Sequence, residues 1–391
     1  MSRKFTFYEF FAGGGMARLG LGDEWDCVFA NDFAPVKEAT YLANFPASAA
    51  HFKKGDVWKL SSEDLPGEAD LAWASSPCQD FSLAGERAGL KGGRSSSFFG
   101  FWRLVEALGR EGRAPRTIVI ENVVGLLSSH GGADFRALCW ALAKEGYFFG
   151  ALEIDASRFV PQSRPRVFIV ATKAKGLTRL TQVEPTRPFH SQRVVCAYDQ
   201  LGADLQSRWQ WWKLTYPPKG ERPLSDFLED DEQVSWFDPP ATLRLRNQLN
   251  DLHRKKLKMA QERGERIVGA LFRRMRVENK VKVQRAELRF DDRAGCLRTP
   301  RGGSSRQVIV VVKGESVRAR RLLPSEAARL MGLDANYKLP KRSTAALEVL
   351  GDGVVVPVVS FLRDNLLAPL AGLHEIQIDG QEDEREMANS R

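Results

Sequence analysis

Short runs of apolar, β-branched and aromatic residues alternate with helical patterns over residues 1–173. Strands are predicted near 4–9, 27–31, 70–74, 116–120, 147–153 and 166–172. Helices are predicted near 15–21, 34–44, 98–110 and 132–145. This alternation is typical of βαβ units, so the pattern predicts an α/β fold built on a doubly wound, mostly parallel sheet.

The pattern weakens after residue 174, where prolines become frequent, and a smaller inserted domain is predicted over 175–306. The β-rich run 307–312, an amphipathic helix from Pro324 and the apolar segment 354–370 indicate a return to the first domain over 307–372. The division is therefore 1–174, 175–306 and 307–372. Residues 373–391 are poor in apolar side chains and are expected to form a flexible tail.

Composition is that of a soluble globular protein, with 43% hydrophobic and 27% charged residues in 391. The start of the chain lacks the basic segment and apolar run of a signal peptide, and no membrane association is expected. The five cysteines are widely spaced and form no CxxC pair. They predict reduced thiols in a cytoplasmic protein and no metal site.

Positive charge is concentrated in one part of the chain. Residues 241–300 hold 17 Lys or Arg against 7 Asp or Glu, whereas the whole chain has a formal net charge of only +9. Such a concentration is typical of a surface that binds a polyanion. A solvated basic helix, such as 253–258, is the other explanation of the same pattern.

A glycine-rich turn follows the first predicted strand, in the stretch Phe11-Ala12-Gly13-Gly14-Gly15. Glycines allow a tight turn there and let the backbone approach a ligand closely. Asp32 ends the second strand, where a carboxylate can accept hydrogen bonds from ribose, and Asp56 follows further on. The pattern fits nicotinamide, flavin or adenosylmethionine proteins, and a plain structural turn has the same appearance.

Two polar residues follow neighbouring apolar runs. Cys78 comes after the run 71–74 and Glu121 after the run 117–120. The loops that leave the carboxyl ends of parallel strands share one edge of the sheet, so a nucleophile and an acid are expected to meet there. This pair suits attack on an electron-poor ring such as cytosine, whose C6 can accept a thiolate once N3 is protonated.

Three stretches of the chain resemble motifs of the DNA cytosine-5 methyltransferases, a family with a Rossmann-like methyltransferase fold. They are Pro77-Cys78-Gln79, Glu121-Asn122-Val123 and Gln162-Ser163-Arg164-Pro165-Arg166. The resemblance implies methyl transfer to C5 of a flipped-out cytosine in duplex DNA, through a covalent bond between Cys78 and C6. It gives Glu121 the role of holding N3, places Arg166 on the base oxygen and beside Glu121, and places Arg164 near the target phosphate or the nucleophile.

The resemblance also implies S-adenosyl-L-methionine as cofactor. The matching positions are Phe11, Gly13, Gly15, Asp32, Asp56, Pro77 and Asp352. Two positions depart from the family's pattern. Met16 stands where the last glycine of the turn is usual, and Asp352 stands where an asparagine is usual.

Contacts with DNA are expected from the segment 81–95, which resembles the family's catalytic loop, and from the inserted domain, which would carry target recognition. The residues expected to contact the substrate are Gln79, Ser82, Arg94, Asn122, Arg298, Arg301, Ser304 and Arg306. The tryptophans 209, 211 and 212 are interpreted as the core of a subdomain or, alternatively, as a surface for stacking on nucleotides.

Other functions share parts of this pattern. A transfer RNA cytosine-5 methyltransferase would carry nearly the same motifs, and only the large basic insertion favours duplex DNA. A DNA-binding relative without activity would not need Cys78, Glu121, Arg164 and Arg166 together. A nicotinamide oxidoreductase would explain the glycine turn alone. We further expect a monomer, with a restriction endonuclease as a possible companion in the same system.

Overall fold

The structure is a computed structural model that describes residues 3–77, 97–217, 220, 222–278, 280–299 and 306–373. The chain forms two compact units. The larger consists of Met1–Ile154, Pro165–Tyr216 and Val358–Arg391, and the smaller of Asp155–Arg164 and Pro217–Pro357. Most of the predicted tail, 374–391, lies outside the described residues.

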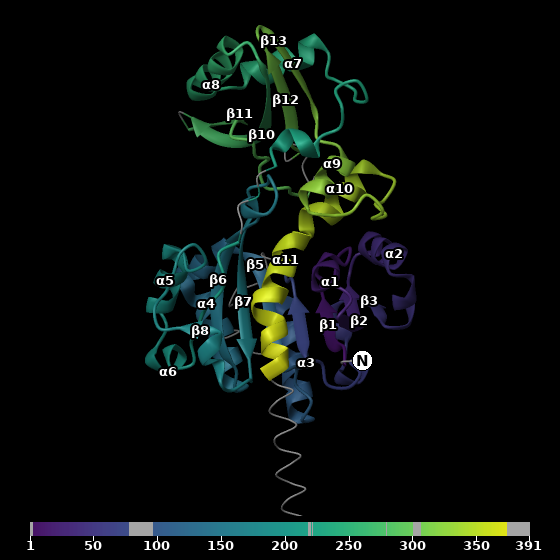
Figure 1. Cartoon of the computed structure of the whole chain (residues 1–391), viewed down its shortest axis with the longest axis vertical. Coiled ribbons are helices and arrows are strands. Elements are labelled where there is room, and N and C mark those ends of the chain that lie inside the picture. Colours follow the sequence, from purple (N-terminus) through teal and green to yellow (C-terminus); the bar gives the residue numbers. More distant parts are fainter. Residues whose placement is uncertain are drawn as a thin grey trace, which may run out of the picture. The chain divides into compact units, whose positions relative to one another are not determined.

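The larger unit is built on a sheet with the strand order β3-β2-β1-β4-β5-β7-β6 (Figure 1). Its strands are β1 (Phe5–Phe10), β2 (Trp25–Asp32), β3 (Phe52–Lys54), β4 (Leu71–Ala74), β5 (Thr117–Val123), β6 (Phe148–Asp155) and β7 (Pro165–Thr172). The strands from β3 to β5 pair in parallel, and β7 is antiparallel to β5. The predicted α/β, mostly parallel sheet is confirmed, and β3 is a strand that the sequence pattern did not indicate.

Helices pack around this sheet, most of them through buried apolar side chains. They are α1 (Met16–Leu21), α2 (Pro35–Asn44), α3 (Ser97–Arg110), α4 (Ala133–Lys144), α5 (Gln192–Asp199), α6 (Ala203–Gln206) and α11 (Val356–Leu362). Of these, α5 contacts the segment Val124–Gly132 and α6 contacts α4. Along β1, Tyr8 and Phe10 join the apolar cluster that contains α3 and α4. Glu9 lies between them in sequence, so the strand's period of two turns it to the opposite face, where it contacts α1 and α2.

Residues 175–216 belong to the larger unit, whereas an inserted domain beginning at 175 was expected. The reason is apolar packing. Trp209, Trp211 and Trp212 are at most 9% exposed, and Trp209 lies edge-on against Phe135 of α4 and Phe149 of β6. The short strands β8 (Thr181–Gln182) and β9 (Trp211–Trp212) pair with each other beside this cluster. The three tryptophans are therefore core residues and offer no stacking surface.

The smaller unit contains an antiparallel sheet with the order β11-β10-β12-β13. Its strands are β10 (Arg266–Glu278), β11 (Val281–Arg289), β12 (Val308–Lys313) and β13 (Ser316–Arg321). The run at 307–312 was expected to return to the first domain. It instead forms β12, which pairs with β10 from Leu271 to Arg266 and with β13 on its other side.

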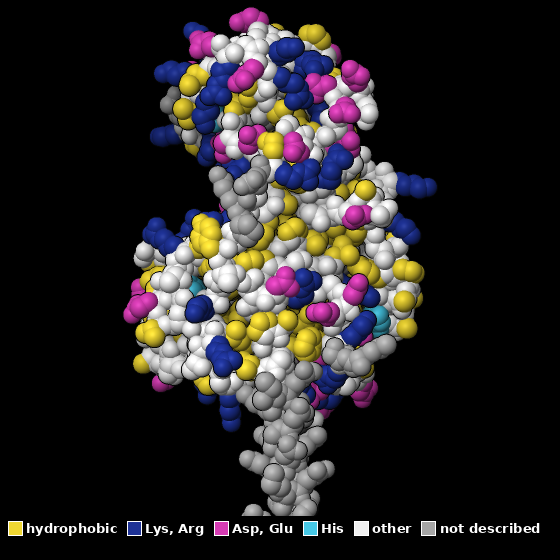
Figure 2. Space-filling model, viewed as in Figure 1, with side chains coloured by type: hydrophobic (Ala, Val, Ile, Leu, Met, Phe, Trp, Pro, Cys, Tyr) yellow, Lys and Arg dark blue, Asp and Glu magenta, His cyan; other side chains and the backbone are white. Residues whose placement is uncertain are grey.

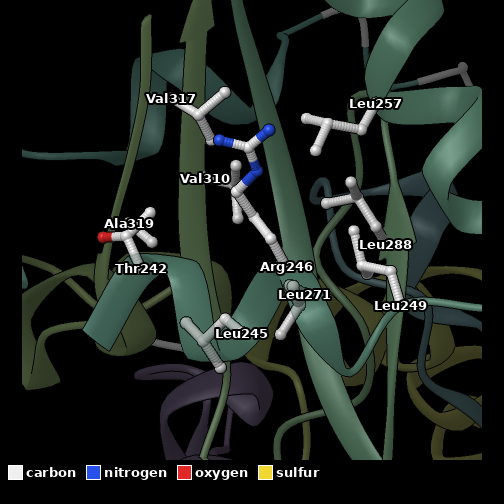
Figure 3. Close-up of a pocket in the computed structure, with 10 residues that line it drawn as sticks. All are labelled: Thr242, Leu245, Arg246, Leu249, Leu257, Leu271, Leu288, Val310, Val317 and Ala319. Atoms are coloured by element: carbon white, nitrogen blue, oxygen red, sulfur yellow. The ribbon is translucent and has the colours of Figure 1, made fainter. Parts of the chain in front are cut away.

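Two helices, α7 (Pro239–Asn247) and α8 (Asp251–Glu262), pack on one face of this second sheet. Their apolar side chains and those of the strands surround a small hollow (Figure 3). The lining residues are Thr242, Leu245, Arg246, Leu249, Leu257, Leu271, Leu288, Val310, Val317 and Ala319. Arg246 extends from α7 along this hollow with its guanidinium at the far end. Its stem therefore covers apolar surface while the residue as a whole stays exposed.

An ion pair is buried next to this sheet. Arg320 of β13 makes two bonds to Glu326 of α9 (Pro324–Leu330), with Nη1–Oε2 at 2.8 Å and Nη2–Oε1 at 2.6 Å. The carboxylate also accepts hydrogen bonds from the backbone N–H groups of Leu323 and Glu229. These bonds tie β13, the start of α9 and the segment before α7 together in a position from which water is excluded.

The apolar run Ser343–Leu373 contains α10 (Ser343–Asp352) and α11, and it is long and apolar enough to cross a membrane. Its most apolar window has a mean hydropathy of 1.8 but is 61% buried within the protein. A helix that packs in a soluble core passes the same test of length and composition. The run is therefore no evidence of a membrane span.

We expect Glu326→Gln to lower the free energy of unfolding by about 3–5 kcal/mol, because it leaves the buried guanidinium of Arg320 without a counter-charge. Urea unfolding followed by circular dichroism measures the change. Glu262→Gln is the matched control, since Glu262 forms an exposed pair with Lys258 that should contribute about 1 kcal/mol or less. Equal losses in the two variants would contradict this role of the buried pair.

Candidate active site

The chain that leads to Cys78 is held to the neighbouring strand by an asparagine. β4 and β5 pair in parallel with Ala74 opposite Ile120, so both strands end at the same edge of the sheet. There Asn122 donates from Nδ2 to the carbonyl oxygen of Ser76 at 3.0 Å and to its Oγ at 3.3 Å. These contacts fix the backbone two residues before Cys78. They also use the amide of Asn122, which was expected to contact the substrate.

Glu121 lies at this edge beside an arginine from the next strand. Its Oε1 is 3.1 Å from Nε of Arg166, and the two side chains are 8% and 15% exposed. The antiparallel register of β5 and β7 places Arg166 opposite Val123, two residues beyond Glu121. The structure thus brings together an acid and a guanidinium that the sequence predicted to act as neighbours.

The residues Cys78, Gln79, Ser82 and Arg94 lie outside the described residues. Their predicted roles therefore stay predictions. Pro77, the described residue directly before Cys78, is exposed. The described part of the edge does fix where the chain approaches Cys78, because Ser75, Ser76 and Pro77 connect it to the end of β4.

Arg164 has different surroundings from Arg166. It belongs to the smaller unit, is 2% exposed, and donates to the carbonyl oxygens of Leu297, Gly351 and Gly353 at 2.7–2.8 Å. The expectation that the two arginines face the same side assumed a continuous extended strand. However, β7 begins only at Pro165, so the alternation does not include Arg164. Arg164 braces three backbone segments, and its contact with a phosphate or nucleophile stays a prediction.

The glycine-rich turn has the backbone conformation that its sequence indicated. Gly13 and Gly15 have positive φ angles of 57° and 79°, and Phe11 has the uncommon value of 56° for a residue with a side chain. A Cβ on Gly15 would lie 2.4 Å from the ring of Phe45, so only glycine fits there. A Cβ on Gly13 would meet nothing within 4 Å, so this side of the turn is open to a ligand.

Asp32 braces the same turn. Its Oδ2 accepts the N–H of Gly13 and its Oδ1 accepts that of Ala34, both at 2.9 Å. Each oxygen keeps a further lone pair, so these bonds leave room for a ribose hydroxyl. Asp56 is partly buried and accepts the N–H of Trp58 at 3.0 Å.

Phe33 is a residue that the sequence reasoning missed. It directly follows Asp32 and is 73% exposed, which is a high value for an aromatic side chain beside a buried strand end. The signal in the sequence was an aromatic residue next to the acid that ends the second strand.

Met16 fills the last position of the turn without strain. It begins α1 and is 1% exposed, and it is not among the residues with positive φ. A glycine is therefore not required at this position, and the side chain contributes to the core instead.

The late motif lies in the smaller unit. Asp352 is exposed at the end of α10, and a Cβ on the preceding Gly351 would lie 2.6 Å from the carbonyl carbon of Arg298. Arg298 is exposed and Arg306 donates to Thr344 at 3.1 Å, whereas Arg301 and Ser304 lie outside the described residues. Among the residues that the structure describes, no group of three His, Cys, Asp or Glu could hold a metal ion.

Comparisons with known proteins agree with this arrangement. The family model of the C-5 cytosine-specific DNA methylases matches residues 5–368. The chain therefore belongs to this family and is a DNA cytosine-5 methyltransferase, as its sequence predicted.

Type II methyltransferase M.BsuFI of Bacillus subtilis is 35% identical over 169 residues, which are 43% of this chain and only 39% of that protein. Type II methyltransferase M.HpaII of Haemophilus parainfluenzae is 25% identical over 387 residues, covering 96% of this chain and 92% of the other. The crystal structure of S. pombe Dnmt2 methyltransferase has a TM-score of 0.58 with 18% identity, over 94% of this chain and 99% of that one. This last likeness shows the fold alone.

We expect Arg166→Met to lower the single-turnover rate of methyl transfer by about a hundredfold, because Glu121 loses the charge that orients it. Cofactor affinity, measured by calorimetry, should change little. The control is Arg193→Met, which breaks an exposed contact to Glu153. A rate unchanged by Arg166→Met would remove the pair from the chemistry.

Proposed function

We propose that this chain transfers the methyl group of S-adenosylmethionine to C5 of a flipped-out cytosine in duplex DNA, through a covalent bond between Cys78 and C6. The observation that carries the proposal is the common edge of β4 and β5. There Asn122 holds the backbone that leads to Cys78, and the adjacent Glu121 is paired with Arg166. A base in the stack hides its faces, so the cytosine must leave the duplex to reach this edge.

The chemistry of the proposed reaction follows from these side chains. The thiolate of Cys78 adds to C6 while Glu121 holds the proton on N3, and electron density moves to C5. S-adenosylmethionine, when bound, supplies an electrophilic methyl group to C5. The C5 proton then leaves to a base, the bond between C6 and sulfur breaks, and Cys78 is regenerated. Arg166 keeps Glu121 oriented throughout.

The larger unit has features that fit the cofactor. The open side of Gly13 lets the methionine part approach the backbone, and Asp32 can accept a ribose hydroxyl. The exposed ring of Phe33 is suited to stacking on an adenine. Asp56 and Pro77 complete the predicted set in this unit, while Asp352 stays a predicted contact of the other unit.

Positive charge on the smaller unit indicates where duplex DNA binds. Most arginines of the second sheet are already neutralised. Arg274 and Arg276 contact Glu287, and Arg266 and Arg318 contact Asp231. Arginines held by carboxylates of the same unit are poorly placed to replace the counterions of a phosphate backbone.

The helices α7 and α8 differ from the sheet in this respect. Their exposed cations without a carboxylate partner in the described chain are Arg244, Arg246, Lys255, Lys256 and, just after α8, Arg263. Figure 2 shows many Lys and Arg side chains, with Asp and Glu among them, on the visible face of the smaller unit. We therefore assign a phosphate-binding surface to these five residues, in addition to the predicted contacts of Arg298 and Arg306.

Transfer RNA is the second candidate substrate, because the same edge residues would serve it. Duplex DNA is favoured by the family and by the names of the Type II relatives. Those names also support a restriction endonuclease as companion in the same system. A cytoplasmic location fits a family that modifies DNA, and we propose a monomer.

The test of the proposed reaction is a duplex that carries 5-fluorocytosine at the target. Fluorine cannot leave C5 as a cation, so the bond between Cys78 and C6 should persist after methyl transfer. We expect a complex that survives denaturing electrophoresis only when S-adenosylmethionine is present. Cys78→Ala should abolish the band, and Glu121→Gln should slow its formation.

The same experiment with fluorinated RNA separates the two substrates. A band with RNA and none with duplex DNA would replace the leading proposal by its alternative. Absence of a band from both would contradict the covalent mechanism. Cys196→Ala, at an exposed cysteine, is the control for Cys78→Ala and should keep the band.

A second prediction concerns salt. Each phosphate contact should make log affinity fall by about 0.9 per log unit of salt. Replacing Arg244, Arg246, Lys255, Lys256 and Arg263 by Gln should weaken DNA binding and flatten this dependence. Fluorescence anisotropy from low to physiological salt measures both. Gln at Arg254 and Lys258, which already pair with Asp251 and Glu262, is the control on the same helix. If the variant with all five substitutions kept the parent's slope of log affinity against log salt, the DNA would bind elsewhere.

A further inference from the structure

A carboxyl group is buried directly behind the glycine-rich turn, and the proposed mechanism does not use it. Glu9, two residues before Phe11, is 1% exposed. Its Oε2 accepts the hydroxyl of Tyr41 at 2.9 Å, and its Oε1 accepts the backbone N–H of Arg18 at 3.3 Å. Neither of these bonds comes from a charged group. A buried carboxylate without a directly bonded cation is expensive, so a purely structural site would more commonly hold an amide or an apolar side chain.

The same contacts connect Glu9 to the turn. Gly15 lies against the ring of Tyr41 and that of Phe45. The guanidinium of Arg18 stands over Phe45, with Cζ 4.3 Å from the ring centre, and Nη1 donates to the hydroxyls of Tyr41 and Ser48. Glu9 therefore contacts α1, the helix that follows the turn, at the backbone of Arg18. It also contacts Tyr41, whose ring lies against Gly15 of the turn.

We infer that Glu9 is a positioning residue of the cofactor turn and that its ionised form favours the positively charged methyl donor over the neutral product. The inference rests on the proposed function, since it needs the cofactor at the turn. The donor has a sulfonium and a net charge of +1, whereas the product S-adenosylhomocysteine has a thioether and no net charge. A negative charge behind the turn, in a medium of low dielectric constant, distinguishes the two ligands. It would aid the exchange of product for donor after each turnover.

The protonation of Glu9 is set near neutral pH by its surroundings. Burial raises the pKa of Glu9 to about 7, while the hydroxyl of Tyr41 and the charge of Arg18 oppose this rise and Asp32 adds to it. Two other titratable groups are close. Burial and Glu9 raise the pKa of Cys27 to about 12, and burial and Arg18 lower that of His51. Cys27 is thus a neutral thiol across the neutral range, and His51 loses its proton at a lower pH than an ordinary histidine, whereas the pKa of Glu9 lies within that range.

The sign of the pH dependence follows by linkage. A bound cation favours the carboxylate and lowers the pKa of Glu9, so binding releases a proton near pH 7. Affinity for the donor then rises as the pH increases through about 7 and is lost as the pH falls. Each unit by which binding lowers this pKa gives a tenfold rise in affinity. Affinity for the neutral product should depend much less on pH.

The experiment is calorimetric titration of the full chain with S-adenosylmethionine and with S-adenosylhomocysteine, between pH 6 and 8.5 and without DNA. We expect the affinity ratio of donor to product to rise by up to about tenfold in the parent chain. In Glu9→Gln, which keeps the shape of the side chain, this ratio should follow only the titration of the ligands' own amino groups. Glu24→Gln, an exposed change before β2, is the control and should behave as the parent.

Tyr41→Phe tests the network if Glu9→Gln does not fold. Loss of the hydroxyl removes a bond to the carboxylate, so the rise in the ratio should move to higher pH. A ratio with the same pH dependence in the parent and in Glu9→Gln overturns the inference, as does a Tyr41→Phe midpoint that is unchanged or lower. Failure of both ligands to bind at any pH would instead contradict the proposed cofactor, so the two failures are distinguishable.

Discussion

The parallel register of β4 and β5 is the constraint on which the candidate site depends. With Ala74 opposite Ile120, the chain leaves both strands at the same level, and Asn122 can reach back to Ser76. A shift of the register by one residue would turn each of the side chains of Asn122 and Glu121 to the face opposite its present one. The sheet interior prevents such a shift, because Leu71, Trp73 and Val119 are fully buried. The packing of apolar side chains thus determines where the chain leaves the sheet just before Cys78, the proposed nucleophile.

Buried carboxylates in this protein are stabilised in two ways. Glu326 and Glu121 contact arginines, which supply a fixed opposite charge. Glu9 accepts hydrogen bonds from a hydroxyl and a backbone N–H, and the guanidinium of Arg18 donates to Tyr41 and Ser48 instead. The first arrangement fixes the orientation of the carboxylate, whereas in the second, by our inference, the charge state depends on what binds nearby. The difference lies in which group the arginine contacts and not in the depth of burial.

The sequence predicted the larger sheet well because its signals are local. The apolar run 70–74 matches β4 to within one residue, and the run 116–120 begins one residue before β5 and ends three residues before its end. Pairing between distant segments has no local signal, so the run at 307–312 was recognised as a strand but assigned to the other unit. Arg164 shows the same limit on a smaller scale. Its spacing from Arg166 was visible, but the start of β7 at Pro165, which separates their surroundings, was not.

The count of charged residues in the sequence was correct, but it did not show which surface of the smaller unit would bind DNA. The excess of Lys and Arg over 241–300 includes the strands β10 and β11 as well as the helices α7 and α8. Pairing within the sheet makes Arg274 and Arg276 partners of Glu287, and their charge serves cohesion of the hairpin. The helices hold fewer acids than bases, so their remaining cations face solvent. DNA binds most favourably to Lys and Arg side chains that have no carboxylate partner, because binding to them releases counterions without breaking an existing ion pair.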